Sequence, residues 1–251
     1  MPNRFRLGFR RETITALNSS LGGSRRYFDK VMDVAPANLI GYWPMNESGG
    51  SSIDYSGQAN NGDYRGVTFG AAGIGDGFTG TQFGVGARNN IFSAALTSDF
   101  NGNTGSFHIW GMVNDITVWS DGAIRYAMEM NSGSGNRVFI SKGTATSTLA
   151  FGKRGGGGAF RQVVINNFAL TDFVGFGITW SNSASRIMAY INGATSGTLA
   201  TPDQYNNALI ESNIGAQTIA TANPWNGILA HGALYNIELP PESMTYIGIR
   251  S

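Results

Sequence analysis

Short apolar segments with alternating large side chains, each followed by a cluster of Gly, Asn, Ser or Asp, recur through most of the chain. Residues 106–115 read SFHIWGMVND, so the odd positions from Phe107 to Val113 alternate with the even positions from His108 to Met112. Alternation with a period of two predicts a strand, and Gly- and Asn-rich ends predict turns. About a dozen such segments at this spacing are typical of a β-sandwich.

The composition agrees with a fold of short strands and tight turns. Charged residues make up 13% of the 251 residues and Gly accounts for 36 of them. Long surface helices would need more Lys and Glu, whereas Gly, Asn and Ser favour turns. Because the chain has no cysteine, disulfides, thiolate metal sites and thiol nucleophiles are excluded.

The positive charge gathers at the start of the chain. Residues 1–30 hold seven basic residues against two acidic ones, and the remainder is mildly acidic. Such an arm can contact nucleic acid, a membrane or an acidic protein surface. We predict three regions: a basic extended arm over 1–23, a short helix and lead-in over 24–38, and a sandwich over 39–251.

Two short helices are expected outside the strands. Tyr27, Phe28, Val31 and Met32 have helical spacing, and Pro36 would stop that helix. A second helix is expected to start at residues 240–241, which are both proline. The first twenty residues lack the apolar core of a signal peptide, and no segment reaches the length of a membrane span. We therefore expect synthesis in a cytoplasm, without a membrane span.

Four motifs occur in an order that resembles the laminin-G-like, concanavalin-A-like lectin and glucanase sandwich family. They are GYWPMNESGGSSIDYSGQANNGDYRG at 41–66, SFHIWGMV at 106–113, FGITWSNSASRIMAYINGA at 176–194 and NPWNGILAHGALYNIELPPESM at 223–244. The resemblance covers roughly residues 39–247. It implies an all-β fold, an antiparallel two-sheet jelly-roll sandwich, here with an N-terminal arm and short helix. It implies no particular activity.

The resemblance also raises the question of calcium in the loop after residue 45. Calcium prefers carboxylate and carbonyl oxygens, and the candidate ligands here are Glu47, Asp54, Asn60 and Asp63. The alternative is that these residues only make turns, because Asn and Asp bond their own main chain. The family often has an acidic pair where this chain has residues 230–231, Ala and His. Both interpretations therefore stay open.

Chemistry for an enzyme is missing from the sequence. A glycosidase needs paired carboxylates, and Glu129 stands alone in its strand. His108 and His231 lie in predicted strands without a nominated nucleophile, so structural roles are expected. GKRGGGGAFR at 152–161 lacks the spacing of a phosphate loop and is interpreted as a hairpin loop. We predict that the protein is not an enzyme.

Aromatic and basic side chains near turns suggest a ligand loop. Trp119 and Trp225 are expected nearer the surface than the other three tryptophans, and Arg154 and Arg161 flank the Gly-rich hairpin loop. Aromatic faces can stack on sugar rings, although packing in the core is the alternative for each tryptophan. These four residues form the predicted ligand loop.

Three functions compete at this point. The first is a virion structural protein of a tailed bacteriophage, in capsid decoration or the tail, because the chain has a lectin-like fold without an export signal. RRYFDKVMDVAPANLIGYWPMNE also resembles the lead-in of laminin-G-like domains in phage virion proteins. Its partners would be other virion proteins, and it would be a homo-oligomer in the assembly. The predicted anchor residues are Arg4, Arg6, Arg10, Arg11, Arg25, Arg26, Tyr27 and Phe28.

The second function is a carbohydrate-binding adhesion module, with or without calcium, that binds a host-surface glycan. The third is a glycoside hydrolase or lyase, which the missing carboxylate pair disfavours. Nucleic-acid binding has little support, because the body is acidic and the arm has few aromatics.

Overall fold

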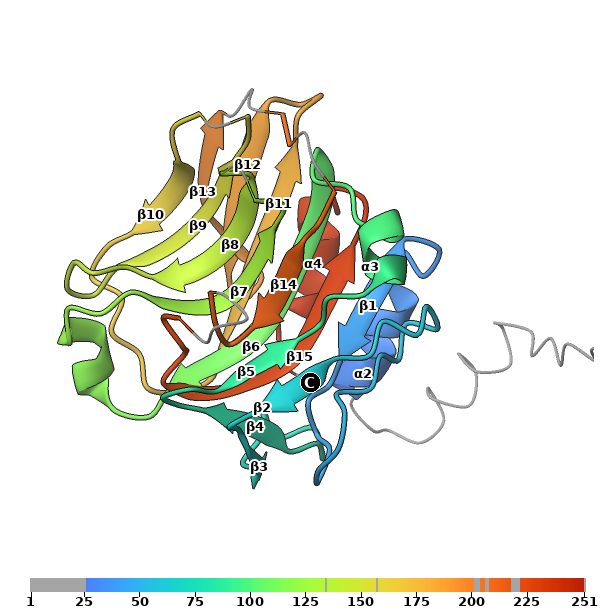
Figure 1. The fold of residues 1–251 in the computed structure, drawn as a ribbon. Helices are drawn as coiled ribbons and strands as arrows, with labels where there is room; N and C mark the ends of the chain where they lie inside the picture. Colours follow the sequence, from blue (N-terminus) through green and yellow to red (C-terminus); the bar gives the residue numbers. More distant parts are fainter. Residues whose placement is uncertain are drawn as a thin grey trace, which may run out of the picture.

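Antiparallel strands form two sheets in the computed structural model of the chain (Figure 1). The structure describes residues 26–133, 135–156, 158–200, 204–205, 208–217 and 222–250. The two sheets pack face to face, so the predicted jelly-roll sandwich is confirmed. No helix in these described ranges is long and apolar enough to cross a membrane.

The first sheet has eight strands and is called the helix-covered sheet below. Its order is β13 (Ala194–Ala200), β12 (Arg186–Ile191), β11 (Val174–Ser181), β6 (Thr104–Val113), β15 (Gly227–Tyr235), β4 (Gly80–Phe83) and β3 (Thr68–Ala71), with β1 (Leu39–Trp43) paired to β15.

The second sheet has seven strands and is called the open sheet. Its order is β10 (Arg161–Ile165), β9 (Leu149–Arg154), β8 (Arg137–Lys142), β7 (Arg125–Asn131), β14 (Glu211–Ile214), β5 (Arg88–Asn90) and β2 (Asp63–Arg65).

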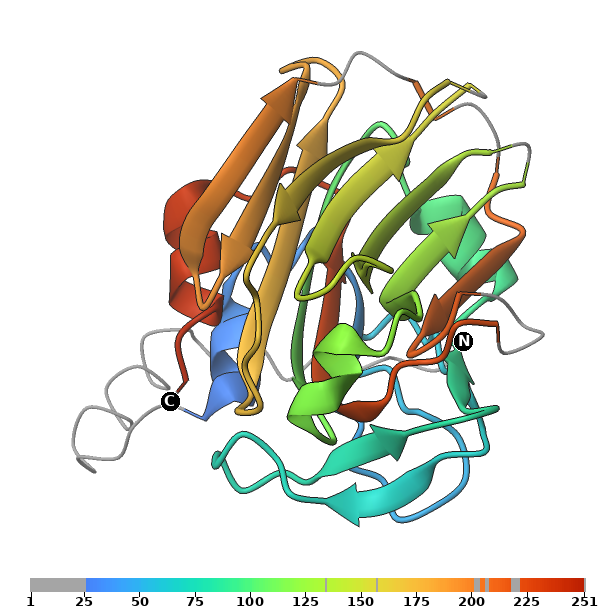
Figure 2. The same ribbon diagram turned by 90° about the vertical axis from the view of Figure 1, so that its left-hand side faces the viewer.

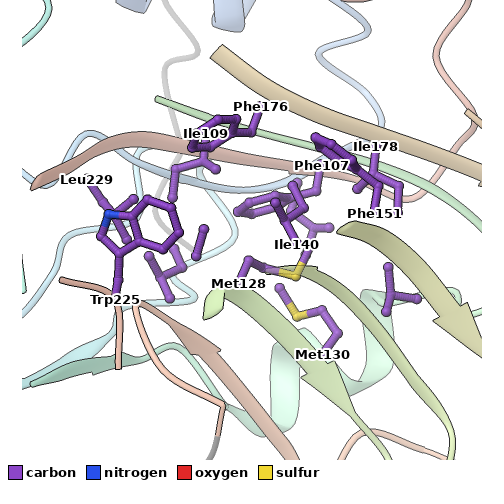
Figure 3. Close-up of a cluster of buried hydrophobic side chains, with 14 of the residues drawn as sticks. Phe107, Ile109, Met128, Met130, Ile140, Phe151, Phe176, Ile178, Trp225 and Leu229 are labelled. Atoms are coloured by element: carbon purple, nitrogen blue, oxygen red, sulfur yellow. The ribbon is translucent and has the colours of Figure 1, made fainter. Parts of the chain in front are cut away.

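The main core fills the space between the sheets. Figure 3 shows part of it, with Phe107 and Phe176 from the helix-covered sheet facing Met128, Ile140 and Phe151 from the open sheet. These side chains are almost fully buried. The alternation predicted for residues 106–115 is confirmed, because the odd positions of β6 enter this core. Burial of apolar area at about 25 cal/mol per Å² supplies the main stabilisation of such a layer.

A second apolar layer covers the outer face of the helix-covered sheet. The predicted helices are present as α2 (Tyr27–Asp33) and α4 (Pro241–Ile247), and both lie against that face (Figure 2). Trp110 of β6 and Met244 of α4 belong to this layer. The sequence did not predict the short helices α3 (Ala94–Asp99) and η1 (Ile116–Ser120).

Polar pairs lie inside this second layer. A 2.8 Å hydrogen bond joins Tyr27 Oη to His108 Nδ1, and another of 2.8 Å joins Tyr42 Oη to His231 Nδ1. His231 Nε2 lies 3.2 Å from Asp76 Oδ2. His231 stands at a register shift in β15 with a φ of +55°, which an irregular strand allows. Both histidines are buried, in agreement with structural roles.

Candidate functional site

One row of residues crosses the outer face of the open sheet from strand to strand. Residues directly opposite in antiparallel strands point to the same face. Phe139 also contacts Tyr126 and Ala150 in a small cluster apart from the main core, which places the row on the outer side. From β10 to β2 the row reads Gln162, Gly152, Phe139, Glu129, Asn213, Asn90 and Asp63.

The half of this face over β7–β10 is hollowed into a groove of about 420 Å³. Val164 and Phe160 are 41% and 46% exposed there, which leaves apolar surface open to a ligand. Grooves with an apolar, aromatic lining and a few polar groups are typical ligand sites. The apolar lining residues are Ile124, Tyr126, Phe139, Ala145, Ala150, Phe160 and Val164.

A glycine lets the central aromatic ring lie flat on the sheet. Gly152 stands opposite Phe139, and a Cβ on Gly152 would lie 2.2 Å from Phe139 Cζ. No side chain could occupy that position without moving the ring. Gly152 and Phe139 together therefore shape the floor of the groove.

Two arginines hold the aromatic side chain at the rim. The guanidinium of Arg154 lies 4.9 Å from the ring centre of Phe160, and that of Arg137 lies 5.7 Å from it. Arg154 Nε also donates a 2.7 Å hydrogen bond to the carbonyl oxygen of Gly158, in the β9–β10 connection. Cation–π contacts of this kind orient the ring that they cover.

The polar lining of the groove consists of hydroxyl and amide groups. They can donate and accept hydrogen bonds around a ligand whose faces rest on the aromatic rings. This combination suits a small, flat ligand with apolar faces and a polar edge. The polar lining side chains are Ser141, Thr144, Thr148, Gln162 and Asn166.

A buried carboxyl group borders the groove. Glu129 lies opposite Phe139 in β7, is 0% exposed, and its Oε1 is 3.1 Å from Arg137 Nη1. Burial raises the pKa of Glu129 to about 8, although Arg137 acts to lower it and Glu211 to raise it. The sequence placed Glu129 alone in a strand, and it lies in β7, a central strand of the open sheet.

The loop after residue 45, called the opening loop below, is held to β1 by hydrogen bonds. Asp54 Oδ1 accepts 2.8 Å hydrogen bonds from the main-chain N–H groups of Tyr42 and Ser56. Asp54 Oδ2 accepts 2.8 Å bonds from Ser56 Oγ and from the N–H of Asn60. Four hydrogen bonds occupy the lone pairs of this carboxylate. Asp54 therefore ties β1 to the loop, as expected of a turn residue.

Two of the other predicted calcium ligands are already hydrogen-bonded within the protein, and the third is exposed on a strand. Glu47 accepts hydrogen bonds from Ile53 N and Tyr64 Oη, at 2.7 and 2.8 Å. Asn60 donates to Ile40 O at 2.8 Å, and Asp63 is exposed on β2. Among the residues that the structure describes, no group of three or more His, Asp or Glu side chains could hold a metal ion. Calcium binding in this loop stays a prediction.

The predicted ligand loop is only partly available. Trp119 and Trp225 are 2% and 0% exposed and pack against each other and the core, so their proposed stacking role was wrong. Their indole N–H groups donate to main-chain carbonyls of Leu170 and Met112. Arg154 lies beside the groove and Arg161 starts the exposed β10.

The structure describes only some of the predicted anchor residues. Arg4, Arg6, Arg10, Arg11 and Arg25, with the whole of the predicted arm, lie outside the described residues. Arg26 is exposed. Tyr27 is fully buried and Phe28 lies 5.5 Å from the Tyr42 ring, so both pack within this chain. As a docking contact for a neighbouring protein Tyr27 was predicted wrongly, because it is fully buried, whereas the role of the partly buried Phe28 stays a prediction.

Sequence reasoning missed the groove residues, although a signal was present. In residues 137–142, RVFISK, Phe139 occupies the outward position between Val138 and Ile140, which enter the core. An aromatic residue on the solvent side of a strand needs a cover or a ligand. The same reasoning applies to Phe160 in the Gly-rich hairpin loop, where only the flanking Arg154 and Arg161 were predicted to contact a ligand.

No family model matches the sequence, and no curated protein matches it. Solved structures do match. The receptor-binding domain of botulinum neurotoxin C/D mosaic serotype aligns with a TM-score of 0.63 at 12% identity, over 85% of this chain and 51% of that chain. The chain thus spans about half the length of that toxin domain.

Two smaller domains match over nearly their whole length. Domain 4 of AbnA, a GH43 extracellular arabinanase from Geobacillus stearothermophilus solved in complex with arabinotriose, has a TM-score of 0.59 at 12% identity, covering 84% of this chain and 98% of that chain. CBM40 of the Ruminococcus gnavus IT-sialidase has a TM-score of 0.55 at 11% identity, covering 67% and 96%. At these identities the likenesses show the fold alone.

Proposed function

We propose that this protein is a non-catalytic carbohydrate-binding sandwich whose ligand lies in the groove on the open sheet. The observation that carries the proposal is the groove itself, where Phe139, Tyr126 and the half-exposed Phe160 meet uncharged hydrogen-bonding groups such as Gln162. Sugar rings have apolar C–H faces and hydroxyl edges, which suit aromatic faces bordered by amides and hydroxyls.

The structural neighbours support the same proposal. AbnA domain 4 was solved with arabinotriose, and CBM40 was also solved bound to alpha2,3 sialyllactose. Both match this chain over almost their full length. The shared fold raises the expectation of sugar binding, while the site must be argued from the residues of this chain.

A binding role is favoured over glycoside hydrolysis. A glycosidase acid must reach the glycosidic oxygen, with a second carboxyl group on the other side of the bond. The side chain of Glu129 is 0% exposed and faces Arg137 rather than the groove opening. Its raised pKa has a structural explanation in burial.

A place on a phage particle stays a prediction from the sequence. Because Tyr27 and Phe28 pack within the chain, an anchor would depend on the basic residues 4–25 that precede them. Removal of residues 1–23 is expected to leave the sandwich folded and to abolish attachment to such a particle. The virion location and the oligomeric assembly also stay predictions from the sequence.

Titration of glycans in a calorimeter tests the proposed site. A glycan array that includes arabinotriose and sialyllactose identifies the ligand, and Phe160→Ala should then weaken its binding by about fivefold to tenfold, the value of one aromatic face. Tyr55→Ala is the matched control, because Tyr55 is 44% exposed and belongs to the opening loop.

The titration should be repeated with calcium and with a chelator. Loss of binding in Tyr55→Ala but not in Phe160→Ala, together with a calcium requirement, would move the site to the opening loop. Failure of every arrayed glycan to bind would contradict the proposed function.

A further inference from the structure

The groove is lined without charge. Among the described residues that line it, every side chain is apolar, a hydroxyl or an amide, with Ser141, Gln162 and Asn166 as examples of the polar ones. We infer that the groove selects uncharged saccharides and discriminates against acidic ones. This inference rests on the proposed function and names its ligand class.

The neighbouring guanidinium groups are engaged by the protein. Arg137 lies 3.1 Å from Glu129 and covers one side of Phe160. Arg154 donates to Gly158 O and covers the same ring. Neither arginine lines the groove. Both guanidinium groups therefore lie against Phe160 at the rim, outside the uncharged lining of the groove.

The groove offers a negative charge no compensation for lost hydration. A carboxylate that moves from water to an apolar surface is strongly destabilised unless a cation pairs with it. Glu129 shows this effect on the same face, since burial holds it protonated up to a pKa of about 8 even beside Arg137. A ligand carboxylate over Phe139 would lie on the uncharged lining of the groove, whereas ligand hydroxyl groups could bond its amides and hydroxyls.

Pairs of glycans that differ only in charge provide the test. Trigalacturonic acid is compared with its full methyl ester, and 3′-sialyllactose with the methyl ester of its sialic acid, on an array that also holds neutral and acidic members of other backbones. For each backbone that binds, the acidic member should bind more weakly by about tenfold or more. Affinity for the neutral member should be unchanged between low and high NaCl, because no ion pair forms.

Gln162→Arg makes the test sharper. Gln162 is exposed on β10 and opposite Gly152, so the variant should fold and place a cation in the lining. We expect it to improve binding of the acidic member by about tenfold relative to the neutral one. Gln162→Met, which removes the amide without adding charge, should leave that ratio unchanged.

The outcomes separate the two proposals. If glycans bind but the acidic members bind as tightly as their neutral parents, the selectivity inference is wrong and the proposed function stands. An unchanged ratio in Gln162→Arg also contradicts the inference. If no glycan on the array binds, the proposed function is wrong and the inference is wrong with it.

Discussion

The two outer faces of the sandwich both carry aromatic side chains, but only one of them is covered. On the helix-covered sheet, Trp110 lies beneath α2 and α4, and Tyr27 of α2 is 0% exposed. On the open sheet, Phe139 floors a groove and Phe160 is 46% exposed. An outward-facing aromatic residue becomes part of a core where a helix covers it. Where no helix does, it is available to a ligand.

Shortening a buried side chain of the covering helix α2 should have the largest effect on the free energy of unfolding. Tyr27→Ala removes a fully buried ring and leaves His108 Nδ1 without its 2.8 Å partner. We expect the free energy of unfolding to fall by about 3–5 kcal/mol, as for other buried aromatic truncations. Urea denaturation monitored by fluorescence measures this value.

The matched change on the other face is Phe160→Ala, for which a loss below about 1 kcal/mol is expected because the ring is half exposed. Equal losses in the two variants would contradict the distinction between a covered and an open face.

Acid should lower the free energy of unfolding through a buried histidine on the covered face. Burial, together with the nearby His231 as the smaller cause, lowers the pKa of His108 to about 3. The unfolded chain, with an ordinary histidine pKa near 6.5, therefore binds the proton more tightly, and stability falls as the pH drops from 6.5 toward 3. The groups around His108 are Tyr27, Trp110 and His231, with Asp76 beside His231.

Denaturation at pH 7 and at pH 4.5 checks this prediction. The loss should approach about 1.4 kcal/mol per pH unit in the steepest part of the range. His108→Gln should be less stable at pH 7, because it changes a buried hydrogen-bonded pair, but it should lose less on acidification. An acid loss of the same size in the variant would assign the effect to other groups.

A rise in pH from about 4.5 to 8 should lower the stability that the open face contributes. The pKa of Glu129 is raised to about 8 by burial, so the folded chain holds this proton more tightly than the unfolded chain. Its contribution is present in full below the unfolded pKa, near 4.5, and is lost as the pH rises toward 8. Glu129→Gln keeps the shape of the side chain and removes the titration.

The stability of Glu129→Gln relative to the unaltered protein should increase with pH, by up to about 1 kcal/mol per unit between pH 5 and pH 8. Denaturation curves at these two pH values measure the difference. A difference that does not change with pH would show that Glu129 is ionised at pH 7 and paired with Arg137.

Strand patterning made most of the fold predictable. Alternation in residues 106–115 placed Phe107 and His108 on opposite faces, and the prolines at 240–241 marked the start of α4. The helical spacing of Tyr27 and Val31 was predicted, and both side chains pack on the body of the protein. The local helices α3 and η1 were missed because each is a single short turn between strands.

The candidate site was much less predictable than the fold. The row through Phe139 and Glu129 depends on register across β7 and β8, which no local pattern specifies. Trp119 and Trp225 lie near turns in sequence, yet the chain folds their rings inward against each other. Asp54 and Asn60 have the composition of a cation loop, but their oxygens are used by the main chain and by Ser93.

The position of α2 determines how the groove is presented. Helix α2 lies on the outer side of one sheet and the groove on the outer side of the other, with the full thickness of the sandwich between them (Figure 2). A partner that packed on α2 would therefore leave the groove open, and large ligands such as polymers could approach it.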